Sequence, residues 1–246
     1  MGSFIEKIAF IDGICTYDKN IQNLIFVTRN DISLSKNLSF DIPVRHLHIN
    51  EALPTILFCH GNGEDIGLYD LNNLSKIFKA NICIFDYAGY GLHTQKISTE
   101  NECQKDVIAV YDYLTLTKNI DPIKIIIYGR SLGSGIACYL AHHLRNNAYQ
   151  PKKLILVSPL YSASHVITDI WVPFNIFMNY KLAPEIKCST LILHGNNDQV
   201  VPFKSGYELS LCFPNLYEFV TLRDCDHNNI GNVSSYYEKI NKFINA

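Results

Sequence analysis

Runs of apolar residues alternate with amphipathic stretches along most of this chain. From about residue 54 onward, six short runs have the composition of buried strands, at positions 55–59, 82–85, 125–128, 154–157, 191–193 and 219–222. Apolar residues are continuous within each run, which is typical of strands that are covered on both faces of a parallel sheet. The pattern therefore predicts an α/β fold with a mostly parallel central sheet.

The stretches between these runs have the spacing of helices. Residues 99–117 are predicted to form one helix, opened by a Thr99-x-x-Glu102 capping box, and the last helix carries an apolar stripe from Val233 to Ile244. Parallel strands joined through such helices are connected by right-handed crossovers. We therefore expect helices on both faces of the sheet.

Two further apolar runs precede the alternating region. They lie at residues 24–27 and 44–49 and are predicted to form an antiparallel strand pair that leads into the sheet. The sequence contains no internal repeat, low-complexity tract or linker-like stretch. Because 246 residues suffice for one large domain with a substantial core, we predict a single domain over residues 1–246.

The segment from about residue 160 to 188 interrupts this alternation, and we interpret it as a short lid. It lies between two predicted core strands and holds the only tryptophan of the chain within a dense apolar and aromatic cluster. Trp171, Phe174 and Phe177 of this segment are predicted to line a groove for an acyl chain or to form a membrane-facing edge. The alternative is that these side chains only pack the lid onto the sheet.

The composition excludes some classes of function. Apolar residues make up 48% of the chain and charged residues 18%, with a net charge of −2 at pH 7. This balance is that of a globular protein, and without a basic stripe we expect no nucleic-acid partner. No grouping of histidine, cysteine and carboxylate residues has zinc-site spacing, so the sequence predicts neither a metal nor a cofactor.

The cysteines and the N-terminus bear on the compartment. No C-x-x-C pair occurs among the eight cysteines, and several of them lie in apolar runs, where a free thiol behaves as a small hydrophobe. The first residues lack the uninterrupted apolar core of a signal peptide or membrane span. We expect a reducing, cytoplasmic location, and peripheral contact with a membrane stays open. The oligomeric state does not follow from the sequence.

The five residues Gly129-Arg130-Ser131-Leu132-Gly133 lie between a predicted strand and a predicted helix. A nucleophile on a tight strand-to-helix turn needs small neighbours, because larger side chains would collide with the strand and the helix. Ser131 would then lie at a helix N-terminus, which favours developing negative charge, and the N–H of Leu132 would be one oxyanion donor. The alternative is a turn that only packs the helix close to the strand.

A serine nucleophile needs a base, and the base needs an acid that orients it. Asp198 follows a predicted core strand, and His227 lies in the loop after the last strand. The chain order Ser131, Asp198, His227 is the order found in α/β-hydrolases, and open α/β sheets place their ligands at C-terminal strand ends. Asp226 is a weaker candidate for the acid, because a sequence neighbour rarely bends back onto its own histidine ring.

The second oxyanion donor is expected in the loop over residues 60–65, which follows an early strand. Small residues in this loop let the chain turn back toward the nucleophile, and the N–H of Asn62 is the best-placed donor. We interpret His60 as a buried structural imidazole. Asp86 is interpreted as a residue that anchors its loop by hydrogen bonds.

From about Ile8 to its C-terminus the chain resembles the α/β-hydrolase superfamily. More narrowly, it is similar to the small single-domain serine hydrolases that include protein depalmitoylases and Bem-type serine peptidase-like proteins. The resemblance is carried by HGNGED (60–65), DYAGYG (86–91), YGRSLGSG (128–135), SPL (158–160), LILHGNNDQVVP (191–202) and HN (227–228). It implies the α/β-hydrolase fold, with Ser131 as nucleophile, Asp198 as acid, His227 as base, and Asn62 and Leu132 as oxyanion donors.

Two features depart from that branch. Its histidine loop usually carries glycines before the histidine, whereas Asp224, Cys225 and Asp226 stand there in this chain. Its depalmitoylases carry an acylated cysteine cluster near the N-terminus, for which Cys15 is the only candidate here. The first departure bears on the conformation of the loop, and the second bears on membrane recruitment.

These observations predict a serine hydrolase that cleaves an ester or thioester through an acyl-enzyme, with an acylated protein, a lipid or a small ester as substrate. An acyl-protein thioesterase or a carboxylesterase fits best. A monoacylglycerol lipase or a serine peptidase-like enzyme is the alternative. A binding or scaffold protein on a hydrolase-like fold is a further alternative, which only the unusual histidine loop favours.

Overall fold

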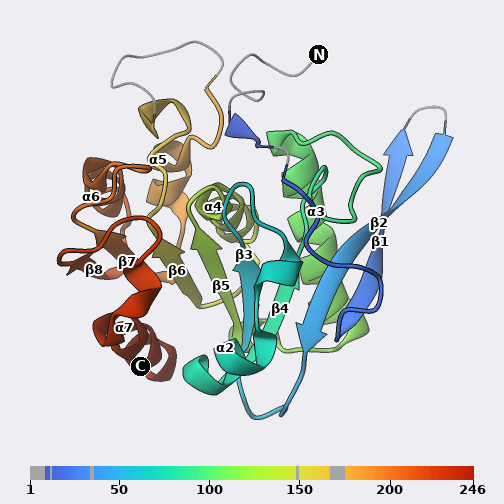
Figure 1. Ribbon diagram of the computed structural model, residues 1–246, viewed down its shortest axis with the longest axis horizontal. Helices are drawn as coiled ribbons and strands as arrows, with labels where there is room; N and C mark the ends of the chain where they lie inside the picture. The colour runs from blue at the N-terminus through green and yellow to red at the C-terminus, as the bar shows by residue number, and fades with distance from the viewer. Residues whose placement is uncertain (1–8, 12, 34–35, 148–149, 167–174) are drawn as a thin grey trace.

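The computed structural model of the protein describes residues 9–11, 13–33, 36–147, 150–166 and 175–246. Within these ranges, eight strands form one sheet in the order β1-β2-β4-β3-β5-β6-β7-β8 (Figure 1). The strands are β1 (Leu24–Ser33), β2 (Lys36–Leu47), β3 (Thr55–Cys59), β4 (Asn81–Phe85), β5 (Ile125–Arg130), β6 (Lys153–Val157), β7 (Ser189–Gly195) and β8 (Leu216–Leu222). Each of the six predicted core runs is a strand of this sheet.

The sheet is mostly parallel, as predicted. All pairs from β4 through β3, β5, β6 and β7 to β8 are parallel, whereas β1 pairs with β2, and β2 with β4, in antiparallel orientation. The antiparallel strand pair expected near the N-terminus is therefore confirmed, and it is longer than predicted. Only residues 44–47 of β2 pair with β4, and the far end of the β1–β2 pair projects past the rest of the sheet (Figure 1).

Helices cover both faces of the sheet. One face carries α3 (Glu100–Asp112), α4 (Gly133–His143) and α6 (Phe203–Ser210), and the other carries α2 (Leu71–Phe78) and α7 (Ser234–Asn245) (Figure 1). Neighbouring strand residues alternate between the two cores, so that Leu57 packs in the first and Ile56 and Phe58 in the second. This two-sided burial is the reason why the strand sequences are continuously apolar.

The first predicted helix begins where the capping box places it. Thr99 is the N-cap of α3, and its hydroxyl accepts a hydrogen bond from the Glu102 N–H at 3.1 Å. The predicted 99–117 stretch is α3 followed by a π-helix. Shorter helical segments are η1 (Ile66–Leu68), η2 (that π-helix, Tyr113–Thr117), η3 (Pro122–Lys124), η4 (Ser164–Val166), α5 (Asn179–Leu182), η5 (Ala183–Glu185) and η6 (Ile230–Asn232).

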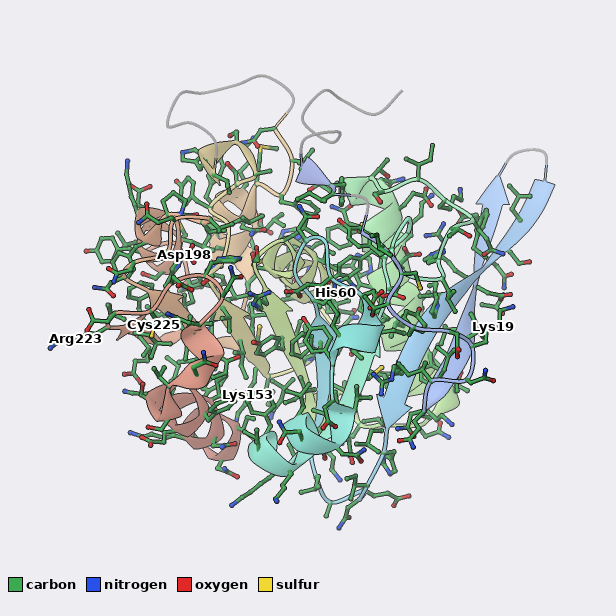
Figure 2. All side chains as sticks on the ribbon, in the orientation of Figure 1. Lys19, His60, Lys153, Asp198, Arg223 and Cys225 are labelled. Atoms are coloured by element: carbon green, nitrogen blue, oxygen red, sulfur yellow. The ribbon has the colours of Figure 1, made fainter. Side chains whose placement is uncertain are left out.

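The parallel strands bring the loops of interest to one edge of the sheet. The loops that follow β3, β5, β7 and β8 all leave the C-terminal ends of their strands. Figure 2 shows His60 and Asp198 toward this edge, and Lys153, the first residue of β6, toward the opposite one. All eight cysteines are free thiols. Within the described ranges, none of the helices has both the length and the apolar character needed to span a bilayer.

Candidate active site

Ser131 occupies a strained turn between β5 and α4. Its φ of +52° lies in the left-handed region, which residues other than glycine rarely adopt. The Ser131 N–H donates to the Val157 carbonyl at 2.9 Å, and the Ser134 hydroxyl donates to the Ser131 carbonyl at 2.6 Å. The surrounding strands and helix therefore impose a backbone conformation that Ser131 would not favour by itself.

The two glycines around Ser131 are required by space. An ideal Cβ at Gly129 would lie 2.6 Å from both the Ala137 Cβ and the Gly133 carbonyl oxygen. An ideal Cβ at Gly133 would lie 2.2 Å from the carbonyl oxygen of Cys59. Real Cβ contacts essentially never fall below 3.0 Å, so a larger residue at either position would move α4 or the turn. This agrees with the steric argument made from the sequence.

The structure brings His227 and Asp198 into direct contact. Nδ1 of His227 lies 2.8 Å from Oδ2 of Asp198, and both side chains are buried. A ring whose Nδ1 donates to a carboxylate has Nε2 as its remaining nitrogen for a reacting group. The carboxylate of Asp226 instead accepts the N–H groups of Asn228 and Asn229, each at 2.8 Å. Asp198, and not Asp226, is therefore the acidic partner of His227.

Asp198 is surrounded by hydrogen-bond donors. Its Oδ1 accepts the backbone N–H groups of Val200 at 3.0 Å and Val201 at 2.8 Å, and its Oδ2 lies 3.3 Å from Nε2 of His194. Burial opposes the charge of this carboxyl, but the hydrogen bonds from His194 and His227 outweigh it and hold the pKa of Asp198 well below its ordinary value. The carboxylate is therefore charged at neutral pH, where it orients the His227 ring.

The loop before His227 takes its shape without glycines. Asp224 has a φ of +57°, a left-handed conformation that aspartate tolerates better than most residues, and its N–H donates to Oδ1 of Asn196 at 2.7 Å. The neighbouring Asp226 closes the next turn through the two N–H groups named above. The departure of this loop from the usual glycine pattern thus leaves a turn in which aspartates supply the backbone conformation and the hydrogen bonds.

Both predicted oxyanion donors lie in the wall of one cavity. Asn62 and Leu132 line the same cavity as Ser131, and none of the hydrogen bonds between described residues engages the backbone N–H of either one. The side chain of Asn62 is fixed, because its Oδ1 accepts from the Ile11 N–H at 3.0 Å and its Nδ2 donates to the Ala9 carbonyl at 2.7 Å. Tyr90 also donates to the Asn62 side chain, at 2.6 Å.

Ser131 and His227 open into a mostly apolar cavity of about 370 Å³. Its lining residues come from the N-terminal segment, the loop over residues 60–65, the turn at Ser131, the predicted lid and the loops that follow β7 and β8: Ala9, Ile11, Asn62, Glu64, Arg130, Ser131, Leu132, Leu160, Ala163, Val166, Phe177, Val200, Val201, His227 and Asn228. At its rim, Ile11 and Val200 are 58% and 50% exposed. An apolar cavity with a few polar groups at one place is the usual form of a small-molecule site.

Of the three predicted substrate-binding residues in the lid, Phe177 is described, and Trp171 and Phe174 lie outside the described residues. Phe177 lines the cavity, yet it is only 2% exposed and packs so closely on α4 that a Cβ at Gly135 would lie 2.3 Å from its ring. Phe177 therefore packs its segment against α4 and also forms part of the cavity wall.

Comparisons with known proteins agree with this architecture. The protein L404 of Acanthamoeba polyphaga mimivirus, which bears the name of an α/β hydrolase, is 36% identical over 176 residues, covering 69% of this chain and 65% of that protein. The human "Alpha/beta hydrolase domain-containing protein 17C" is 30% identical over 195 residues, covering 77% of this chain and 57% of that protein. A family model described as "Serine aminopeptidase, S33" matches residues 50–182, more than half of the chain. The chain belongs to the α/β-hydrolase superfamily.

The matched region spans less than two thirds of the length of either relative of this α/β hydrolase. Among solved structures, Est1E of Butyrivibrio proteoclasticus with ferulic acid bound has a TM-score of 0.65 at 17% identity, covering 82% of this chain and 94% of that one. At that identity the likeness concerns the fold.

Several features of this α/β hydrolase were not foreseen from its sequence. Ser131 and His227 line one cavity, but no hydrogen bond joins these two described side chains. Arg130 and Glu64 form an ion pair in the cavity wall, and the only signal in the sequence was the position of Arg130 inside the nucleophile motif.

Among the residues that the structure describes, no group of three or more histidine, cysteine and acidic side chains is arranged to hold a metal ion.

Proposed function

We propose that this protein is a serine hydrolase that cleaves an ester or thioester bond through an acyl-enzyme intermediate. Ser131 is the nucleophile, His227 the base and Asp198 the acid. The backbone N–H groups of Asn62 and Leu132 bind the oxyanion. The substrate classes that we favour are acylated proteins, for an acyl-protein thioesterase, and small esters, for a carboxylesterase.

One observation carries the proposal: the His227–Asp198 hydrogen bond of 2.8 Å is at the cavity into which the strained Ser131 turn opens. A charged, buried carboxylate on Nδ1 fixes the tautomer in which Nε2 accepts a proton, and it stabilises the imidazolium that results. The other oxygen of Asp198 accepts two backbone N–H groups, which hold the carboxylate in the orientation that it presents to the His227 ring. The absence of a Ser131–His227 hydrogen bond is compatible with this role, because such contacts often tighten only when substrate is bound.

The reaction proceeds in two halves. In acylation, His227 takes the proton of the Ser131 hydroxyl while Oγ bonds to the acyl carbon, and the carbonyl oxygen becomes an oxyanion between the Asn62 and Leu132 N–H groups. Collapse of this intermediate breaks the bond to the leaving group, which departs with the proton from His227. In deacylation, His227 takes a proton from water as the water oxygen attacks the acyl carbon, and it returns that proton to Ser131 when the acid leaves.

The cavity supports an acyl substrate. The lid and the loop after β7 contribute apolar walls through Leu160, Ala163, Val166, Phe177 and Val201, and such walls suit an acyl chain. The exposed apolar rim gives such a chain a path from the surface.

A peptidase function, which the description of the matching family suggests, is supported less well. The only carboxylate among the described residues that line the cavity belongs to Glu64, and it is already ion-paired with Arg130 instead of being available to an N-terminal amine.

The experiment that tests the proposal is labelling with a fluorescent fluorophosphonate, which reacts with activated serines. The wild-type protein should be labelled, and Ser131→Ala and His227→Ala should not. Ser235→Ala, which changes an exposed serine on α7, is the matched control and should label as the wild type does. Ester hydrolysis is then measured on p-nitrophenyl acetate, octanoate and palmitate, and thioester hydrolysis on palmitoyl-coenzyme A.

Two results would contradict the proposal. If folded wild-type protein is not labelled, the site is not an activated serine, and the non-catalytic binding or scaffold function becomes the better explanation. If labelling persists in Ser131→Ala, another serine is the reactive one, and the assignment of the nucleophile is wrong.

A further inference from the structure

Arg130 connects two loops of the site that are far apart in the sequence. It immediately precedes Ser131, and its side chain is largely buried, with 17% exposed. Its Nη2 donates to the backbone carbonyl of His227 at 3.0 Å, across 97 positions of the chain. Its Nη1 forms an ion pair with Oε1 of Glu64, across 66 positions. The guanidinium therefore contacts the His227 loop on one side and the loop over residues 60–65 on the other.

Glu64 is itself held in place. Its Oε2 accepts the backbone N–H of Gly61 at 2.7 Å and the hydroxyl of Tyr69 at 2.5 Å. Burial opposes the charge of Glu64, but attraction to Arg130 and the hydrogen bond from Tyr69 outweigh it and lower the pKa of this carboxyl. The ion pair is therefore intact at neutral pH. A planar guanidinium can donate to two such acceptors in fixed directions at once.

We propose that Arg130 is a positioning residue, which together with Glu64 fixes the backbone of the His227 loop relative to the loop over residues 60–65. This inference rests on the proposed function, because it takes His227 as the base. Arg130 itself touches neither the acyl group nor the reacting atoms. It acts through the His227 carbonyl, and thereby on the distance between the imidazole and Ser131.

The other contacts of His227 still allow its backbone to move relative to Ser131, and the contact with Arg130 restricts this movement. Asp198 holds the ring at Nδ1, and a ring held at one nitrogen still moves with its own backbone. In the loop that carries His227, the hydrogen bonds of Asp226 shape the turn and the Asp224 N–H joins the loop to Asn196, but neither contact attaches it to the turn at Ser131. The Arg130 contact supplies an attachment at the residue next to the nucleophile. Displacement of a catalytic group by about 1 Å costs on the order of 100-fold in rate.

The test compares Arg130→Met, Glu64→Gln and the double variant with the wild type. Arg145→Met is the matched control, because Arg145 makes the same two kinds of contact away from the site: a carboxylate, Glu185, at 2.7 Å and the backbone carbonyl of a histidine, His142, at 2.9 Å. It lies just beyond the C-terminal end of α4, the end of that helix opposite Ser131. Each variant is assayed for p-nitrophenyl octanoate hydrolysis and fluorophosphonate labelling rate, at a temperature where circular dichroism shows it folded.

We expect Arg130→Met to lower kcat and the labelling rate by about 10- to 100-fold, with KM changed by less than about twofold, because the substitution leaves the apolar walls of the cavity in place. Glu64→Gln should lower kcat by about 3- to 10-fold, and the double variant should be no slower than Arg130→Met, because both changes break one chain of contacts. Arg145→Met should keep the wild-type kcat.

A purely structural role would lower the melting temperature of Arg130→Met without changing kcat in the folded range, and this result would overturn the inference. Additive losses in the double variant would overturn it as well, because independent effects are not one bridge. If Arg130→Met does not fold, Glu64→Gln decides alone, and a wild-type kcat for that variant refutes the bridge. Unlabelled wild type would overturn both the proposed function and this inference, whereas labelled wild type with an equally active Arg130→Met would overturn the inference only.

Discussion

Replacing Gly129 by alanine tests whether close packing at the turn between β5 and α4 determines both the stability of the protein and the reactivity of Ser131. The new methyl group would lie 2.6 Å from the Ala137 Cβ, 2.6 Å from the Gly133 carbonyl oxygen and 2.8 Å from the Ser134 Cα. None of these atoms is the end of a flexible side chain. Each would have to retreat by about 0.6–0.8 Å to restore ordinary contact at 3.4 Å. α4 must therefore shift away from β5 as a unit.

Such overpacking costs about 1–3 kcal/mol of the free energy of unfolding. In a chain of this size, each kcal/mol lowers the melting temperature by about 2–4 °C, so Gly129→Ala should melt about 2–12 °C below the wild type. Because α4 begins just after Ser131, the shift also moves the serine, and we expect the labelling rate to fall by about 10- to 100-fold. Thermal unfolding followed by circular dichroism and the fluorophosphonate labelling rate measure the two effects.

Gly231→Ala is the matched control for this change. The nearest atom to a Cβ at Gly231 is the Tyr237 hydroxyl at 3.5 Å, which is ordinary contact. The control should therefore keep the melting temperature and the labelling rate of the wild type. If Gly129→Ala has wild-type stability and reactivity, the turn accommodates the added methyl group without a shift of α4, and the steric reasoning is wrong.

Two other changes test the support of the site. Asn62→Ala removes the three side-chain hydrogen bonds to residues 9–11 and Tyr90, each worth about 1 kcal/mol, so urea unfolding should show a loss of about 2–3 kcal/mol, and an unchanged value would contradict the role of Asn62 in holding that segment. Burial raises the pKa of Asp86 to about 7, against an opposing hydrogen bond from Tyr17. The folded protein then keeps a proton that the unfolded chain releases at about pH 4, so wild-type stability should fall with rising pH between about 4 and 7, and not further above 7. Relative to Asp86→Asn, which cannot ionise, the fall should total up to about 4 kcal/mol in urea unfolding, and parallel pH curves for the two proteins would refute it.

The central sheet and the turn at Ser131 follow from local sequence. Continuous apolar runs predict strands buried on both faces, and each run is a strand. The spacing of glycines around Ser131 predicts the turn, because only glycine fits where β5, α4 and the turn meet. Ser131, Asp198 and His227 could be predicted to lie at one edge of the sheet, because each follows a strand and the C-terminal ends of parallel strands meet at one edge.

Other features were settled only by tertiary packing. No local pattern places Ala9 and Ile11 in the cavity wall or attaches Asn62 to that segment, because these contacts join positions more than 50 residues apart. The bounds of helices α2 and α6 were not predicted, since each is only eight residues long and has a short apolar pattern.

Local periodicity and motif spacing thus determined which elements form and which residues stand at their ends. The Glu64–Arg130–His227 connection shows what they could not determine. Arg130 is the last residue of β5, whereas Glu64 and His227 lie in two separate loops, and nothing in the spacing of one residue constrains the side-chain direction of another. Only the packing of β3, β5 and β8 in one sheet fixes how closely those loops approach. The sequence by itself specified the parts of the site, and the tertiary structure decided which parts touch.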